Sequence, residues 1–139
     1  MQHHARSALR LLTTMKDVTV AILDDNPLVL KLTRVLLERE GISVVTATSW
    51  IECNHLLANA TPDLMLMDVN LPSIKGNRIS MAFKAQERTR DIPIVLISDL
   101  PEETLMGLAA EAGAQAYLRK PLTREKLLEV IERFVHRNV

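Results

Sequence analysis

Short apolar runs alternate along the chain with segments whose apolar residues recur at helical spacing, from Val18 onward. The runs are typical of strands buried on both faces, and they span 18–23, 42–47, 64–67, 92–98 and 116–119. The helical segments span 28–40, 50–60, a stretch from the loop containing Gly76 to about Gln86, 101–113 and 123–137. The alternation predicts one α/β domain, a doubly wound five-stranded parallel sheet covered on both faces by five helices through right-handed crossovers.

Helix-capping residues support these boundaries. Asn26 is placed to cap the first helix, with Pro27 at the first helical position and Gly41 beyond the end. Ser49 and Glu52 have the spacing of a capping box at the start of the second helix. The predicted elements are short, and no repeat or linker interrupts them.

Composition narrows the class of protein. A chain of 139 residues suits one domain, and 47% apolar residues with 3% aromatic predict an aliphatic core, in which Met65, Met67 and Met81 are interpreted as filler. The formal net charge of zero gives no electrostatic reason for nucleic acid or an anionic membrane as the main partner. No apolar run approaches the roughly 20 residues that cross a bilayer. The single cysteine, Cys53, excludes an internal disulfide. We therefore expect a cytoplasmic domain.

Residues 1–16 differ from the rest of the chain. They carry Arg6, Arg10 and Lys16 but no acidic residue, and they lack the long apolar stretch of a secretory signal. An organelle transit peptide, vector-derived residues and an alternative start at Met15 are all compatible with this composition. We expect residues 1–16 to be a flexible, weakly amphipathic N-terminal extension and residues 17–139 to form the domain.

Polar residues that could do chemistry follow the predicted strands. Asp68 ends the uncharged run 64–67, where an ionised group is costly unless something pairs with it. In open α/β sheets the carboxyl ends of the strands form the site, and those ends carry Asp24, Asp25, Asp68, Ser98, Asp99 and Lys120. Three carboxylates that converge there would disfavour joint ionisation unless a cation joins them. Hard oxygen ligands suit Mg²⁺, and a lysine and a hydroxyl complete a set suited to a phosphoryl group, which Asp68 would accept.

These residues also carry a family resemblance. Over roughly Asp17 to Val139 the chain resembles a response-regulator receiver domain of two-component signalling, in the segments ILDDNP, LMLMDVNLPSIKG, IPIVLIS and AYLRKP. All four segments occur in order at the ends of successive predicted strands. The resemblance implies the strand order 2-1-3-4-5 of a flavodoxin-like sheet.

The resemblance implies a role for each matching residue. Asp68 would be the phosphoacceptor, and Mg²⁺ would be bound by Asp25 directly, by Asp24 mainly through water, by Asp68 and by the backbone carbonyl of Asn70. Lys120 would pair with the phosphoryl oxygens and Ser98 would hydrogen-bond them. Tyr117 would move inward with Ser98 and remodel a protein-interaction surface on the fourth helix, fifth strand and fifth helix. The apolar residues expected to contribute to that surface are Leu105, Met106, Leu108, Ala109, Leu127, Ile131 and Phe134.

The implied function is that of a stand-alone response regulator, a signalling domain and not an enzyme. It would receive its phosphoryl group from a sensor histidine kinase or phosphotransfer protein and act on a downstream protein target, with a homodimer as a further possibility. In the family the residue after the switch hydroxyl is usually small, and here it is Asp99, which we expect to modulate the rate of phosphorylation.

Other interpretations of the same residues stay open at this point. A pseudo-receiver that docks proteins without phosphorylation is the main alternative, and Asp99 favours it. A flavodoxin-like nucleotide binder is poorly supported, because no Gly-rich phosphate cradle is present. Taken singly, the acid pair could favour a turn, Lys120 could be a surface lysine, and Tyr117 could be a static edge residue. Ser98 or Asp99 could cap the following helix.

Overall fold

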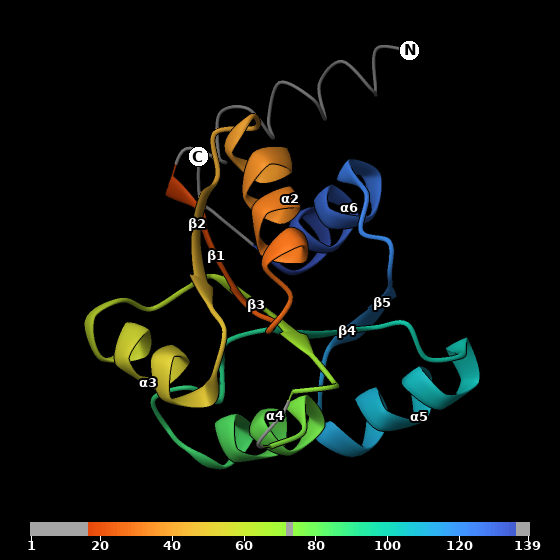
Figure 1. Ribbon diagram of the computed structural model, residues 1–139. Coiled ribbons are helices and arrows are strands. Elements are labelled where there is room, and N and C mark those ends of the chain that lie inside the picture. The colour runs from red at the N-terminus through yellow and green to blue at the C-terminus, as the bar shows by residue number, and fades with distance from the viewer. Residues whose placement is uncertain (1–16, 72–73, 136–139) are drawn as a thin grey trace.

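The computed structural model describes residues 17–71 and 74–135, which form one parallel sheet between two layers of helices (Figure 1). The strand order is β2-β1-β3-β4-β5, as the resemblance implied. The strands are β1 (Thr19–Leu23), β2 (Ser43–Ala47), β3 (Leu64–Asp68), β4 (Ile94–Ser98) and β5 (Ala116–Arg119). The predicted fold class is confirmed.

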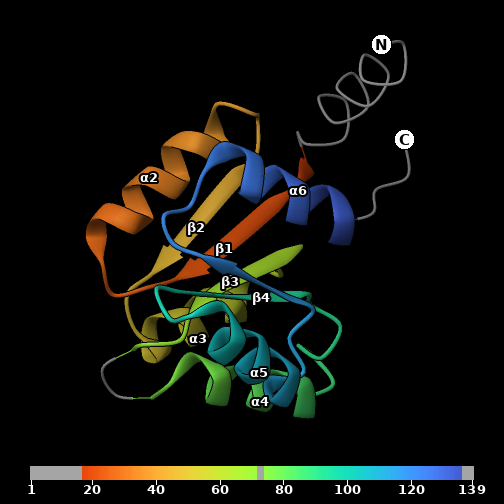
Figure 2. The same ribbon diagram turned by 90° about the vertical axis from the view of Figure 1, so that its right-hand side faces the viewer.

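Helices cover both faces of the sheet. On one face α2 (Pro27–Glu38) and α6 (Arg124–Phe134) lie side by side, and the other face carries α3 (Trp50–Asn59), α4 (Gly76–Ala85) and α5 (Glu102–Ala112) (Figures 1 and 2). Two cores follow from this arrangement, one on each side of the sheet. Because β3 and β4 lie in the middle, every residue of both strands is buried.

The predicted caps are confirmed. The Asn26 side chain accepts a hydrogen bond from the Leu28 amide at 2.9 Å, and Pro27 opens α2. The Ser49 hydroxyl accepts from the Glu52 amide at 3.2 Å at the start of α3. Gly113 ends α5 with a φ of 70°, a left-handed conformation that favours glycine. Capping residues therefore fix where these helices begin and end.

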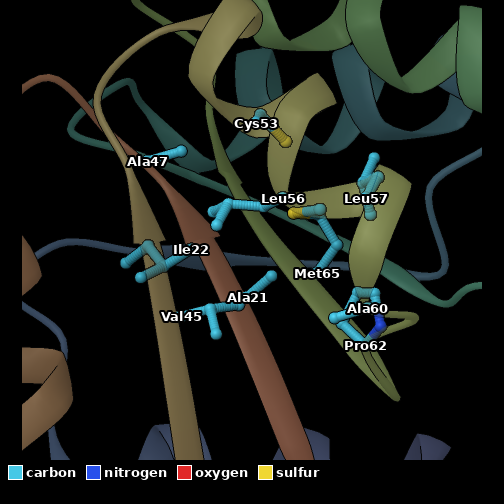
Figure 3. Close-up of a pocket in the computed structure, with 10 residues that line it drawn as sticks. All are labelled: Ala21, Ile22, Val45, Ala47, Cys53, Leu56, Leu57, Ala60, Pro62 and Met65. Carbon is cyan, nitrogen blue, oxygen red and sulfur yellow. The ribbon is translucent and has the colours of Figure 1, made fainter.

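A small cavity lies beneath α3 (Figure 3). Its volume is about 10 Å³, close to that of one water molecule, but its walls are apolar apart from one thiol. Its lining residues are Ala21, Ile22, Val45, Ala47, Cys53, Leu56, Leu57, Ala60, Pro62 and Met65. The cavity is therefore a minor packing defect, with Cys53 directed into it.

Two expectations about single residues need correction. Met65 and Met67 are fully buried as predicted, but Met81 is 49% exposed, because it lies two positions from both Ile79 and Phe83, the buried face of α4. Gly76 is the first residue of α4, whereas the sequence placed it in the preceding loop. The expectations for residues 1–16 and for the chain beyond 135 lie outside the described residues. Within the described residues, no helix is long and apolar enough to span a bilayer.

Candidate functional site

The strand register brings the predicted site residues to one edge of the sheet. Leu23, the last residue of β1, pairs with Met67 of β3, so Asp24 and Asp68 follow at the same level. Asp68 pairs with Ile97 of β4, and Ser98 pairs with Arg119 of β5, directly before Lys120. Four strands thus bring functional side chains to the same edge, and β1 is followed by two of them, Asp24 and Asp25.

Three carboxylates meet at this edge. Oxygen atoms of Asp24, Asp25 and Asp68 all lie within 4.8 Å of one another. Asp24 is fully buried, Asp68 is 3% exposed, and Asp25 is exposed at the mouth. Burial, and then the charge of Asp24, raise the pKa of Asp68, while Lys120 and the backbone amide of Asn70 oppose that rise. The convergence expected from the sequence is present.

Lys120 supplies the opposing charge. Its ammonium lies 2.9 Å from Asp24 Oδ2 and 3.4 Å from Asp68 Oδ1. Burial lowers the pKa of Lys120, but its contacts with Asp24 and Asp68 outweigh burial and raise it overall, so the ammonium stays charged. A cis peptide bond joins Lys120 to Pro121, and the Lys126 ammonium donates to the carbonyls of Arg119 and Pro121.

The donor set suits a hard divalent cation. Asp24 Oδ1 accepts from the Asn26 amide at 2.9 Å. Oδ2 of the same residue forms the ion pair with Lys120 but accepts no well-directed hydrogen bond from the described residues, although it is buried. A buried acceptor with spare capacity beside two further carboxylates offers the hard oxygen ligands that suit Mg²⁺. The residues present therefore fit a magnesium ion.

The start of α4 is pressed against the end of β3. A Cβ atom added at Gly76 would lie 1.9 Å from the backbone carbonyl oxygen of Asp68. The Gly76 amide also donates to the Val69 carbonyl at 3.0 Å. Only glycine permits this approach without displacing the helix, and the position of Asp68 is thereby fixed from the side of α4.

Ser98 and Asp99 have different surroundings. Ser98 is fully buried, and its hydroxyl accepts from the Leu100 amide at 3.0 Å, within the loop before α5 and not within the helix. Asp99 is exposed and lines a groove of about 340 Å³ together with Lys120 and Asn26. Pro101 occupies the N-cap position of α5, and no side chain caps that helix. The interpretation of Ser98 or Asp99 as the cap of α5 is therefore wrong.

Tyr117 is half-buried on β5 and its hydroxyl donates to Glu102 Oε1 of α5 at 3.1 Å. This hydrogen bond is the main cause that raises the pKa of Tyr117. Glu102 is not among the functional residues predicted from the sequence. Its position in the first turn of α5, directly after the loop that leaves β4, was the available signal, since β5 is the neighbour of β4.

The expected interaction surface on α5, β5 and α6 shows little apolar area in this state. Leu105, Leu127 and Ile131 are fully buried and Ala109 is 4% exposed. Leu108 and Phe134 are half-buried, and Met106 is 51% exposed. Most of the residues named from the sequence therefore belong to the core, and Met106 is the exposed one among them.

Fold and site together define the class of protein. The family model of the response regulator receiver domain matches residues 20–132. The chain belongs to this family, and it is a signalling protein of the two-component type.

Individual relatives agree with this assignment. The chain is 30% identical over 117 residues to the polar-differentiation response regulator DivK of Brucella ovis, covering 84% of this chain and 95% of that protein. It resembles the receiver domain of the sensor histidine kinase PA1611 from Pseudomonas aeruginosa, solved with a magnesium ion in its active site cleft, at 25% identity and a TM-score of 0.75, covering 84% and 96%. The chemotaxis regulator CheY4 of Vibrio cholerae, at 24% identity and a TM-score of 0.77 over 85% and 98%, shares the fold.

Proposed function

We propose that this protein is a phosphoacceptor response regulator in which Asp68 receives a phosphoryl group. One observation carries the proposal: three carboxylates converge at the strand ends with one ammonium in contact with two of them. Such a pocket presents carboxylate oxygens towards solvent through the exposed Asp25. A purely structural ion pair would need neither the third carboxylate nor the spare acceptor on Asp24.

Asp24, Asp25, Asp68 and the backbone carbonyl of Asn70 would hold Mg²⁺. When bound there, the ion supplies positive charge that offsets the repulsion between the pocket and an incoming phosphoryl group. The PA1611 receiver domain, with magnesium in its active site cleft, supports this use of the acidic residues.

The chain's own residues would carry the transfer. An oxygen of ionised Asp68 forms a bond to phosphorus, the bond from phosphorus to the donor nitrogen breaks, and the donor takes up a proton. Lys120, already within 3.4 Å of Asp68, would pair with the phosphoryl oxygens. Ser98 would exchange its bond with the Leu100 amide for one to the phosphoryl group. Because that exchange moves the loop before α5, it would strain the contact between Tyr117 and Glu102 and change the surface of α5, β5 and α6.

Donor and target follow from the family. The donor would be a sensor histidine kinase or a phosphotransfer protein, and the target would be a downstream protein or a second copy of the chain. We place these events in the cytoplasm, without nucleic acid as a direct partner. The protein would promote its own phosphoryl transfer and dephosphorylation and would not act as an enzyme on other substrates.

Acetyl phosphate with Mg²⁺, followed by mass spectrometry of the intact chain and its peptides, tests the proposal. We expect one acid-labile phosphoryl group on Asp68, absent without Mg²⁺ and absent in Asp68→Asn. Asp63→Asn is the matched control, because it makes the same change at the other end of β3, where the carboxylate accepts from the Thr19 amide. Full phosphorylation of Asp68→Asn would refute the assignment of the acceptor.

A second candidate is a docking module that works without phosphorylation. The specific observation in its favour is the exposed Asp99 in the groove beside Lys120, where its charge opposes an incoming dianion. The same experiment separates the two functions, because a pseudo-receiver would take up no phosphoryl group from acetyl phosphate at any Mg²⁺ concentration.

A further inference from the structure

Side chains from β5 hold the segment that joins β4 to α5. This segment is residues 99–101, and α5 follows it without a side-chain cap. Arg119, the last residue of β5, donates from Nε to the Leu100 carbonyl at 3.0 Å. Tyr117 lies two positions earlier, on the same face of the strand, and donates to Glu102 in the first turn of α5. Two side chains on one face of β5 thus tie the segment and the start of α5 to the sheet.

The backbone of Leu100 depends on two side-chain hydrogen bonds. Its amide donates to the Ser98 hydroxyl at 3.0 Å, and its carbonyl accepts from Arg119. Among the described residues, no further hydrogen bond reaches the backbone of Asp99 or Leu100. A Ser98 hydroxyl that turns towards a phosphoryl group leaves the Leu100 amide without its acceptor. The hydrogen bond from Arg119 is then the one that still holds Leu100 in place.

The backbone of Arg119 is itself well anchored. Arg119 pairs with Ser98 in the register of β4 and β5, and its carbonyl accepts from the Lys126 ammonium at 2.9 Å. A hydrogen bond donated by a guanidinium is charge-assisted and stronger than one between neutral groups. The end of β5 is therefore the fixed partner of this contact, and Leu100 is the partner that can move.

We propose that Arg119 is a positioning residue that holds Leu100 in the position seen in the structure and thereby opposes the movement of Ser98 towards a phosphoryl group. The inference rests on the proposed function, because the movement that Arg119 opposes is the one that would follow phosphoryl transfer to Asp68. If Leu100 moves with Ser98, its carbonyl leaves Arg119 and one charge-assisted hydrogen bond is lost. Arg119 thus determines how much of the unphosphorylated protein adopts the switched arrangement.

The charge of Arg119 and its hydrogen bond predict opposite effects on the binding of a phosphoryl mimic. A guanidinium attracts anions, so the loss of its charge would weaken the binding of an anionic mimic at Asp68. The loss of its hydrogen bond to Leu100 frees the segment before α5 and strengthens that binding. The direction of the change therefore separates the proposed role of Arg119 from a general electrostatic one.

Titration of Arg119→Met with beryllofluoride and Mg²⁺, a mimic of the phosphorylated aspartate, tests the proposal through the amide signals of the isotope-labelled chain. We expect the apparent affinity to be about fivefold higher than in the parent, as the loss of one opposing hydrogen bond predicts. Without ligand, the signals of residues 98–101 should be displaced towards their positions in the beryllofluoride-bound parent. Arg124→Met is the matched control and should change neither result, because Arg124 is an exposed arginine that pairs with Glu40 on the other face of the sheet.

An unchanged or lower affinity in Arg119→Met overturns the proposal. So does a lowered thermal midpoint without displaced loop signals, since Arg119 would then contribute to stability alone. A parent chain that binds no beryllofluoride refutes the proposed function and with it the switching role. Hydrogen exchange of the Leu100 amide in the ligand-free chain then still decides whether Arg119 holds Leu100. Arg119→Met should accelerate this exchange and Arg124→Met should not, and equal exchange in the two variants would show that Arg119 holds nothing.

Discussion

Asp68 and Cys53 are both buried titratable side chains, 3% and 2% exposed, and burial is the main cause that raises the pKa of each. Their surroundings differ. Asp68 lies among two carboxylates and an ammonium, with the exposed Asp25 at the mouth of the pocket. Cys53 points into a cavity with apolar walls beneath α3 (Figure 3).

The difference shows what turns a perturbed group into a candidate site. Burial alone destabilises the charged form of a side chain, and in the Cys53 cavity no cation restores it, so the thiol stays neutral and inert. At Asp68 the ammonium of Lys120 opposes the rise in pKa that burial and Asp24 cause. A counter-charge and an open side, not the size of the pKa shift, distinguish the site.

The largest expected contrast is in the reactivity of the thiol. Because its pKa is raised from 9.0 to about 12, Cys53 should react with iodoacetamide roughly a thousandfold more slowly than an ordinary thiol. Asn54→Cys, on the exposed side of α3 in the parent background, provides the reference rate. Alkylation rates followed by mass spectrometry measure the ratio. Comparable alkylation rates at positions 53 and 54 would mean that the cavity opens readily. Access would then not distinguish Cys53 from Asp68.

The next contrast removes the counter-charge from the acidic pocket. Lys120→Met should slow Mg²⁺-dependent phosphorylation by about a hundredfold, as the loss of one preorganised electrostatic contact does. Lys126→Met removes the same charge from α6, where the ammonium contacts the backbone carbonyls of Arg119 and Pro121, and should change the rate much less. Stopped-flow measurements with acetyl phosphate compare the two. Equal effects would show that loop position, not charge at Asp68, determines the rate.

A smaller effect is expected from the acid in the groove. Asp99→Ala should accelerate phosphorylation by up to about tenfold, because a unit charge several ångströms from the phosphodonor repels it by on the order of 1 kcal/mol. The acceleration should shrink as salt is added. Glu103→Ala is the control, because Glu103 is also an exposed acid but lies in the first turn of α5. An unchanged phosphorylation rate in Asp99→Ala would show that this carboxylate does not affect the access of the phosphodonor.

The smallest effect concerns stability without Mg²⁺. The raised pKa of Asp68 means that the folded state binds its proton more tightly than the unfolded state does. Ionising Asp68 therefore costs stability, and this cost grows as pH rises from the unfolded pKa, about 3.9, through the folded pKa. Asp68→Asn should raise the thermal midpoint by a few degrees at neutral pH, and the gain should vanish in acid. A gain that persists well below the unfolded pKa would contradict this origin.

The convergence of the acidic residues was predictable because it follows from topology. Once the resemblance supplies the strand order, Asp24 and Asp68 must meet, because they follow the carboxyl ends of the neighbouring strands β1 and β3. Lys120 follows β5, one strand further along, and its long side chain reaches both carboxylates. The starts of α2 and α3 were predictable for a different reason. The caps Asn26 and Ser49 act within a few residues, so the local sequence is enough to identify them.

Contacts that depend on side-chain conformation were not predictable. The sequence places Glu102 in the first turn of α5, but the bond from Tyr117 to Glu102 also requires the relative height of β5 and α5, which no local pattern encodes. The exposure of Met81 could have been predicted from helical periodicity, because a residue two positions from a buried residue of a helix points away from the core. Composition alone suggested a buried methionine.

The two glycines inside helices set different limits on how this chain can vary. Gly107 on α5 has nothing within 4 Å of an added Cβ. Alanine at this position should therefore stabilise the helix by about 1 kcal/mol, and packing does not limit which residue evolution can place there. At Gly76 even one added carbon would collide with the backbone carbonyl of Asp68. No substitution at position 76 leaves α4 where it is, so a library randomised there and selected for a native-like fold should return glycine alone. Packing therefore leaves position 107 on α5 free to vary and restricts position 76, where α4 touches the end of β3, to glycine.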